Sequence, residues 1–167
     1  MGMDTVYWRL PPADLNQLRS AGDLLACETY VGRQRGEFPV NLRRFDTYRG
    51  KTLTLLLDAI GDPADPFWPL FNGGRPIGDP AAPGGHQFHY WTPGEVAALA
   101  RAMADLFQSG AKLQSRIDSA VRPTVSPEAA PDRIRLAVRE AQWGFERLLC
   151  FFRLAEDAGD AMLWVTW

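Results

Sequence analysis

Residues 126–167, at the C-terminal end, carry the pattern that most constrains the fold. Ser126 and Pro127 are typical of a helix start, because serine can accept a hydrogen bond from a free backbone N–H and proline needs no partner there. Apolar residues then recur at steps of three and four as far as Ala155, which places them on one helix face. Gly159 suits the left-handed turn that ends a helix. The pattern predicts a long amphipathic helix.

Residues 161–167 follow this helix and are almost all apolar, with many aromatic and β-branched side chains. Such a run is typical of a strand that is buried on both faces. We therefore expect a central C-terminal strand in a mixed or antiparallel sheet. A chain of 167 residues with 46% hydrophobic residues suits one domain with one core. The predicted class is an α+β fold in a single domain, residues 1–167.

The N-terminal part predicts a strand, a helical region and a loop. Residues 5–10 are rich in β-forming side chains, and the two prolines that follow cannot continue a strand. The next apolar residues have helical spacing, with a weak point at Gly22. Residues 31–51 contain several arginines broken up by glycine and proline, so we expect an exposed basic loop there.

The middle of the chain alternates between apolar segments and turns. Residues 52–60 have the three/four spacing of a short buried helix. Residues 61–85 are rich in proline and glycine and predict a long loop. A strand is expected at 86–91. Residues 92–95, with threonine first and glutamate three positions later, form a capping-box pattern that opens a helix. A shorter helix or connection follows at 111–124.

Composition excludes several classes of protein. The formal net charge is −2, which does not favour nucleic-acid binding. No Sec-type signal is visible, and no apolar run approaches the ~20 residues that span a bilayer. Cys27 and Cys150 are the only cysteines, and two isolated cysteines are more common as free thiols in a reducing compartment than as a disulfide. We expect a soluble, cytoplasmic protein without membrane attachment.

Several segments occur in an order that resembles a known family. They are residues 1–3 (Met-Gly-Met), the block 44–61 with its three consecutive leucines, residues 74–79, residues 90–96 and the tail 147–167. Together they are similar to the YfbM-like family of small bacterial proteins, a domain-of-unknown-function family. The resemblance covers most of the chain.

The resemblance implies a single-domain α+β fold and a bacterial, cytosolic origin. It implies no reaction and no catalytic residues. Relatives usually carry an aromatic residue and a histidine in the block that corresponds to 46–53 here. Tyr48 can fill the aromatic position, but the block contains no histidine. If that histidine performs chemistry in relatives, this chain has lost it.

His86 and His89 are the only histidines, so any histidine chemistry must use them. Residues three apart on a strand point to opposite faces, and no cluster of cysteines or carboxylates offers further metal ligands. We expect no metal and no cofactor. One alternative is an enzyme acting on a small polar substrate, with His86 or His89 as the base and Asp79 assisting. Aspartates beside glycine and proline more often form turns.

The remaining signal is a group of arginines and aromatic residues, the types that are enriched where proteins bind each other. We hypothesise a non-catalytic protein-binding module, such as an immunity or antitoxin-type protein that occludes a toxin or another neighbouring gene product. The expected contact residues are Arg33, Arg35, Arg43, Arg44, Tyr48, Phe67 and Trp68. RNA binding through residues 33–51 is a weaker alternative, which the net charge disfavours.

Overall fold

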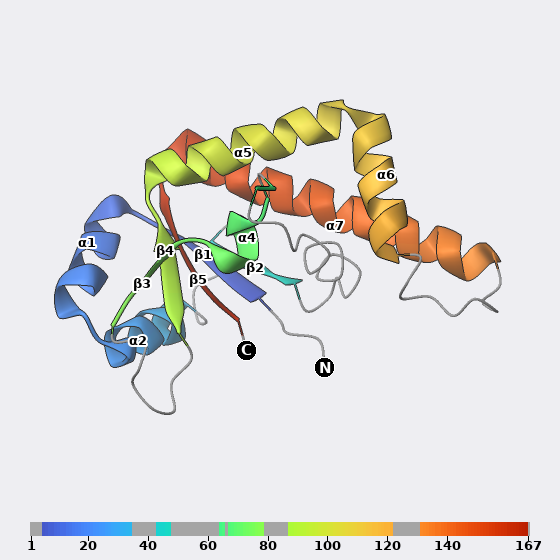
Figure 1. The fold of residues 1–167 in the computed structure, drawn as a ribbon. Coiled ribbons are helices and arrows are strands. Elements are labelled where there is room, and N and C mark those ends of the chain that lie inside the picture. The colour runs from blue at the N-terminus through green and yellow to red at the C-terminus, as the bar shows by residue number, and fades with distance from the viewer. Residues whose placement is uncertain are drawn as a thin grey trace.

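The structure is a computed structural model, and it describes residues 5–34, 43–47, 64–65, 67–78, 87–121 and 131–166. One sheet lies at its centre, with strand order β2-β1-β5-β4-β3 and antiparallel pairing between all neighbours (Figure 1). The strands are β1 (Thr5–Leu10), β2 (Arg44–Asp46), β3 (Arg75–Pro76), β4 (Phe88–Trp91) and β5 (Ala161–Thr166). The predicted α+β class is confirmed, and the pairing is antiparallel rather than mixed.

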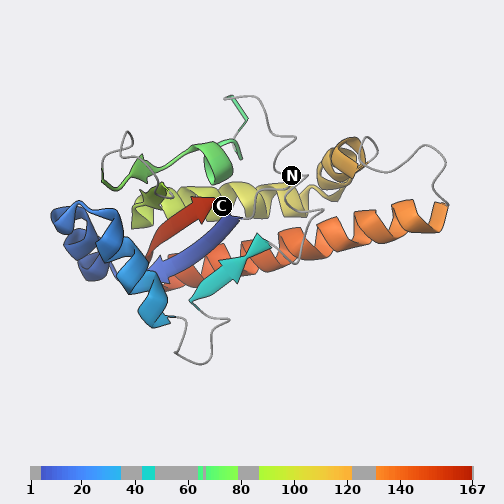
Figure 2. The same ribbon diagram turned by 90° about the horizontal axis from the view of Figure 1, so that it is seen from below.

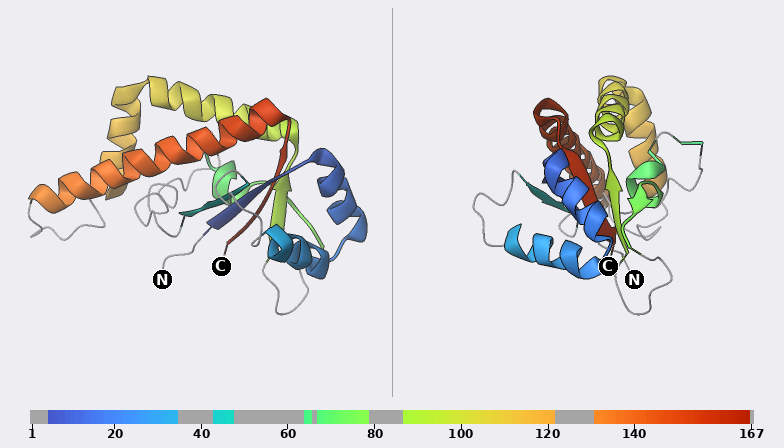
Figure 3. Two further views of the ribbon diagram at one scale, coloured as in Figure 1. Left: turned by 180° about the vertical axis from the view of Figure 1, so that it is seen from behind. Right: turned by 90° about the vertical axis from the view of Figure 1, so that its left-hand side faces the viewer.

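Helices cover both faces of this sheet. They are α1 (Pro12–Ala21), α2 (Leu24–Gln34), α4 (Pro69–Asn72), α5 (Pro93–Gln108), α6 (Gly110–Val121) and α7 (Pro131–Ala158). Residues of α1 and α2 pack with one face of the sheet, and residues of α4, α5, α6 and α7 pack with the other (Figure 3). The sheet is therefore the middle of three layers and separates two apolar clusters.

β5 occupies the centre of the sheet, as the sequence predicts. It pairs with β1 along its whole length, from Thr5 opposite Thr166 to Leu10 opposite Ala161, and with β4 on its other side. Met162 and Trp164 belong to the apolar cluster under α5 and α7, whereas Leu163 and Val165 belong to the cluster under α1 and α2. Both faces of this strand are buried because each is covered by helices.

α7 is the longest helix in the described part of the chain, and it extends past the end of the sheet (Figure 2). The apolar residues that the spacing places on one face are buried from Ala141 to Ala155, and Phe151 joins them. Gly159 has φ 66°, which confirms the predicted left-handed turn between α7 and β5. The predicted start at Ser126 lies outside the described residues, and the helix is described from Pro131.

The region after β1 forms two helices. Pro11 precedes α1 with extended backbone angles, and Pro12 occupies its first turn, so the prolines that end the strand also begin a helix. Gly22 has φ 63° and ends α1, which explains the predicted weak point. Cys27 and Cys150 are both free thiols, as expected. Cys27 is buried, and burial is the main cause that raises its pKa to about 11, whereas Cys150 is exposed on α7.

Two predicted loops contain regular structure, and those predictions are wrong at these positions. The basic loop expected at 31–51 begins inside α2 and contains β2, whose Phe45 contacts Phe151 at a ring distance of 5.6 Å. The loop expected at 61–85 contains α4 and β3. These elements are too short to produce a recognisable period, and they form by packing and pairing with distant segments. The helix expected at 52–60 lies outside the described residues.

The predicted capping box at the start of α5 is present. The Thr92 backbone N–H donates to Glu95 Oε2 at 2.8 Å, and the Thr92 hydroxyl donates to the same atom at 2.7 Å. Arg75 of β3 pairs with Glu95 Oε1 at 3.0 Å. Burial acts to raise the pKa of Glu95, but the hydrogen bonds from Thr92 and the charge of Arg75 outweigh it, so this pKa is lowered overall. The carboxylate therefore holds the edge strand to the helix start.

Replacing Glu95 by alanine should lower the free energy of unfolding at pH 7 by about 1 kcal/mol, the usual value of a lost cap. Because the folded-state pKa is lowered, this stabilisation is present above the ordinary pKa of 4.5 and disappears as the pH falls through the folded value. Urea unfolding of both proteins at neutral and acidic pH measures the effect. Glu28→Ala, which removes an exposed carboxylate from α2, is the control. An equal loss at both pH values would contradict the assignment.

Candidate functional site

Stacked aromatic rings cover the sheet face under α5 and α7. The rings of Trp91 and Trp164 are 5.4 Å apart and nearly parallel, at 18°, and those of Tyr7 and Trp91 are 5.9 Å apart. Phe152 of α7 packs 6.0 Å from both Tyr7 and Trp91. The Tyr7 hydroxyl donates to the Leu70 carbonyl at 2.9 Å, and burial raises the pKa of Tyr7 well above its usual range. The cluster thus joins the sheet to α4 and α7.

His89 borders this cluster. It lies on β4 directly opposite Trp164 of β5, and the two ring centroids are 4.6 Å apart. Its Nδ1 is buried and has no hydrogen-bond partner among the described residues, and burial lowers the pKa of the imidazole. The side chain is therefore neutral near pH 7. Within the described ranges no acid or nucleophile is hydrogen-bonded to it. Asp79, the suggested assisting residue, and His86, the alternative base, lie outside these ranges.

The backbone at Gly74 passes close to two indole rings. Gly74 has φ +84°, and a Cβ at this position would lie 3.0 Å from Trp164 Nε1 and 3.2 Å from Trp91 Nε1. Both indole nitrogens are buried, and neither has a hydrogen-bond partner in the described part of the chain. The Gly-Gly pair at 73–74 therefore has a packing role, because only a residue without a side chain can lead from α4 to β3 here. Sequence reasoning found no role for this pair.

Gly74→Ala should destabilise the protein more than Gly78→Ala. Gly78 has almost the same backbone angle, φ +83°, but a Cβ there would have no neighbour closer than 3.5 Å. Both variants should lose about 1–2 kcal/mol because an L-residue disfavours this conformation. Gly74→Ala should lose about 1–3 kcal/mol more through overpacking against the two indoles and the Tyr90 carbonyl, which would also lie 3.0 Å from the Cβ. Chemical denaturation measures both losses, and equal values would show that the indole contacts do not matter.

His89 should make the fold less stable in mild acid. A histidine whose folded-state pKa is lowered contributes stability that is complete above its ordinary pKa of 6.5 and is lost as the pH falls toward the folded value. The unfolding free energy should therefore fall less between about pH 7 and about pH 5 in His89→Phe than in the parent protein. His86 is retained in both proteins and cancels in the comparison. Identical pH profiles would contradict the lowered pKa.

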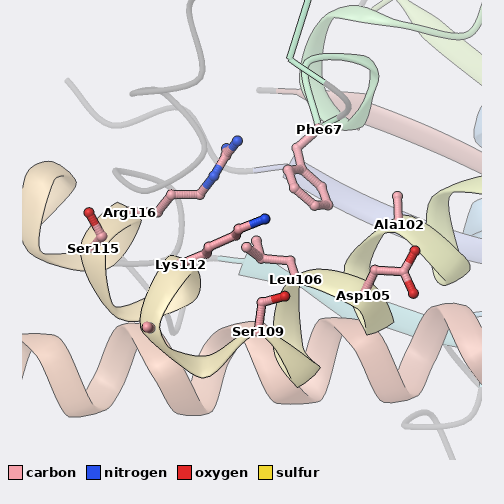
Figure 4. A pocket seen from close by; sticks show the side chains of 9 residues that line it. Phe67, Ala102, Asp105, Leu106, Ser109, Lys112, Ser115 and Arg116 are labelled. Atoms are coloured by element: carbon pink, nitrogen blue, oxygen red, sulfur yellow. The ribbon is translucent and has the colours of Figure 1, made fainter.

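A groove lies at the corner between α5 and α6, on a different part of the surface. The chain turns at Ser109, whose backbone N–H is 3.1 Å from both the Asp105 and Leu106 carbonyls. The groove has a volume of about 650 Å³. It is lined by Phe67, Ala102, Asp105, Leu106, Ser109, Ala111, Lys112, Ser115 and Arg116 (Figure 4). We call it the elbow groove.

The α6 side of the elbow groove carries positive charge beside an apolar floor. Arg116 pairs with Asp65 at 2.7 Å, and its guanidinium carbon is 5.2 Å from the centre of the Phe67 ring. Lys112 is exposed, and no ion pair forms with it in the described ranges. Asp105 lies across the groove on α5 (Figure 4). The arrangement can receive a group that combines a negative charge with an apolar surface.

Sequence reasoning did not identify Lys112 or Arg116. Both occur singly in a helix, without any cluster of charge around them in the sequence. The groove forms only because Asp65, 51 residues away from Arg116, brings Phe67 against α6. A basic residue on a predicted helix gives no local sign of such a contact.

Two of the predicted contact residues near β2 and α2 are exposed. Arg33 lies near the end of α2 and lines a groove of about 360 Å³ between α1 and α2. Arg43 is exposed just before β2. Arg44 is half-buried, because it pairs with Asp46 at 2.9 Å and lies 5.9 Å from the centre of the Trp8 ring. The other two, Arg35 and Tyr48, lie outside the described residues.

The predicted aromatic contacts differ from the expectation. Phe67 is only 3% exposed and packs edge-on against Phe145 at 6.4 Å, so it is mainly a core residue, and its contact with a partner stays a prediction. Trp68 is half-buried against the same core. Both are on the sheet side that carries α5 and α7, whereas Arg33 is on α2, across the sheet. Arg33 therefore does not form one patch with Phe67 and Trp68, whereas Phe45 of β2 belongs to the same cluster as Phe67.

Groups of metal ligands and membrane-spanning helices are both absent from the described ranges. No group of three or more histidine, cysteine, aspartate or glutamate side chains there is arranged to hold a metal ion. None of the helices in those ranges combines the length and apolar character needed to cross a membrane.

The comparisons with known proteins agree with the fold. Residues 1–165 match the family model described as domain of unknown function DUF1877. The crystal structure of a protein of unknown function, YfbM from Escherichia coli, superposes with a TM-score of 0.59 at 15% sequence identity. The similarity covers 98% of this chain and 99% of that one. At this identity the likeness shows the fold alone. No curated protein matches the chain.

Proposed function

This chain belongs to the DUF1877 family, and we propose that it acts as a non-catalytic protein-binding module. Its most specific form is an immunity or antitoxin-type protein that occludes a toxin encoded by a neighbouring gene. The observation that supports the proposal is the elbow groove, where the cation Lys112 stands beside an apolar floor. An exposed cation beside a concave apolar surface is complementary to a partner side chain pair that is acidic and apolar.

The charges of the elbow groove define the partner. Asp65 neutralises Arg116 and holds it against Phe67, so Lys112 is the cation left to attract a ligand group. Asp105 lies across the groove, so an acidic ligand group has to bind on the α6 side, away from this carboxylate. A partner segment that places an aspartate or glutamate beside a leucine or an aromatic residue would match both features. Because the groove is open, it suits a protruding segment of a larger molecule better than an enclosed small molecule.

The other two functions have less support. Catalysis with His89 as the base needs an acidic group or a nucleophile within hydrogen-bond reach of the imidazole, and the described ranges supply neither. RNA binding needs several free cations on one surface, but Arg44 is paired with Asp46 and Arg116 with Asp65. The net charge of −2 also opposes it. A protein partner remains the function that the geometry supports best.

Co-expression with the products of the adjacent genes tests the proposal. We expect one of them to co-purify in a defined complex and, if it is a toxin, to lose its growth-arresting activity. Lys112→Glu should weaken this complex at least tenfold in a titration, because it places a negative charge opposite the acidic partner group. Arg133→Glu, the same charge change at an exposed position of α7, is the control.

Two results would overturn the proposal. One is a chain that binds no neighbouring product and protects against none. The other is a complex that Lys112→Glu and Arg133→Glu weaken to the same small extent, which would place the contact away from the elbow groove.

A further inference from the structure

The outward face of α7 carries an apolar stripe. Leu136, Trp143 and Leu154 are 47%, 57% and 41% exposed, although all three are large apolar residues. They are separated by seven and eleven residues, which are close to two and three helical turns, so they lie on one line along the helix. The opposite face of α7 is buried against the core. This stripe is therefore a second apolar surface of the same helix.

The complete stripe has the same spacing in both directions. Its positions are 136, 140, 143, 147, 150 and 154, with steps of four and three that alternate. Suppose that an identical helix from a second copy packs antiparallel on this stripe, with the contact centred at position 145 of both helices. Position 136 of one copy then faces position 154 of the other, position 140 faces 150, and position 143 faces 147. A surface that maps onto itself in this way fits the two-fold contact of a homodimer.

The side chains at these facing positions are complementary. Leu136 would meet Leu154 of the second copy, an apolar pair at each end of the contact. At the centre, Trp143 would meet Arg147 of the second copy. Within one chain the Arg147 guanidinium already lies 4.8 Å from the centre of the Trp143 ring, so this cation is positioned on aromatic surface. The same guanidinium lies 5.9 Å from the centre of the Phe45 ring, so a second indole would join a cation that already contacts two rings.

The charges beside the stripe fit the same arrangement. Glu140 lies about one and a half turns before the two-fold centre and would stand about one turn from Arg147 of the second copy, within reach of an ion pair. The two-fold axis repeats this pair, so each copy contributes one glutamate and one arginine. This pairing requires a partner surface with the same side chains in the opposite order, and a second copy of the helix supplies that surface.

We propose that two copies of this chain associate through the outward faces of α7, antiparallel and centred near position 145. The contact uses one helix face and is small, so the dimer is reversible, with dissociation in the micromolar range. The elbow groove is on α5 and α6 and stays open in the dimer. This proposal does not depend on the proposed function, and either can fail alone.

Sedimentation velocity from about 5 to about 500 µM tests the association on the full chain. We expect a shift from monomer to dimer with rising concentration. Trp143→Glu should raise the dissociation constant at least tenfold, whereas Leu25→Glu, at a position 70% exposed on α2, should leave it unchanged. A monomer throughout this range would overturn the proposal. So would a dimer that both variants weaken equally.

Disulfide crosslinking tests the antiparallel register of the two α7 helices, and it does not depend on whether Trp143→Glu folds. Cys150 is exposed and free, and it would face position 140 of the second copy. Glu140→Cys should therefore give a covalent dimer under mild oxidation, with the bridge mapped between positions 140 and 150. Arg153→Cys, on the same helix but off the stripe, should crosslink at least tenfold more slowly. Equal rates, or bridges only between identical positions, would contradict the antiparallel pairing.

Discussion

β5 is hydrogen-bonded on both sides and buried on both faces, and the other layers are positioned by contact with it. Its pairing with β1 brings the two ends of the described chain together, and its pairing with β4 brings in α5, which starts two residues after that strand. Gly159 lets α7 turn directly into β5, so the longest described helix must fold back over the strand that follows it. The backbone N–H and C=O groups of a strand buried in this way must form hydrogen bonds with the neighbouring strands. The register in which β5 pairs with β1 and β4 is therefore strongly restricted.

The aromatic cluster is a consequence of this register. Trp164 of β5 lies opposite Tyr7 on one neighbour and opposite His89 on the other, so three rings share one sheet face. Such close packing restricts the next layer. Gly74 is the position where the segment from α4 to β3 crosses the indoles, and the missing side chain is what permits the crossing. His89 is part of this packed region, and burial there lowers the pKa of its imidazole, which lies tilted against the Trp164 ring.

The surface features arise where helices extend past the sheet. The elbow groove forms at the corner of α5 and α6, and the pair between Asp65 and Arg116 holds its floor in place. The stripe on α7 forms because this helix has one face on the core and another in solvent. These surfaces are separate, so a chain of this size can present a partner site and a self-association face at once.

Local sequence alone determined the elements whose signals lie within a few residues. The helical spacing before Ala155, the glycine at 159, the apolar run of β5 and the capping box at Thr92 identify α5, α7 and β5, and with them the α+β class. Tertiary structure alone decided that β2 and β3 exist, that Phe67 is buried and that Asp65 meets Arg116. The reason is physical: a strand of two or three residues is stable only beside a neighbour, and a contact across 51 residues leaves no periodic trace.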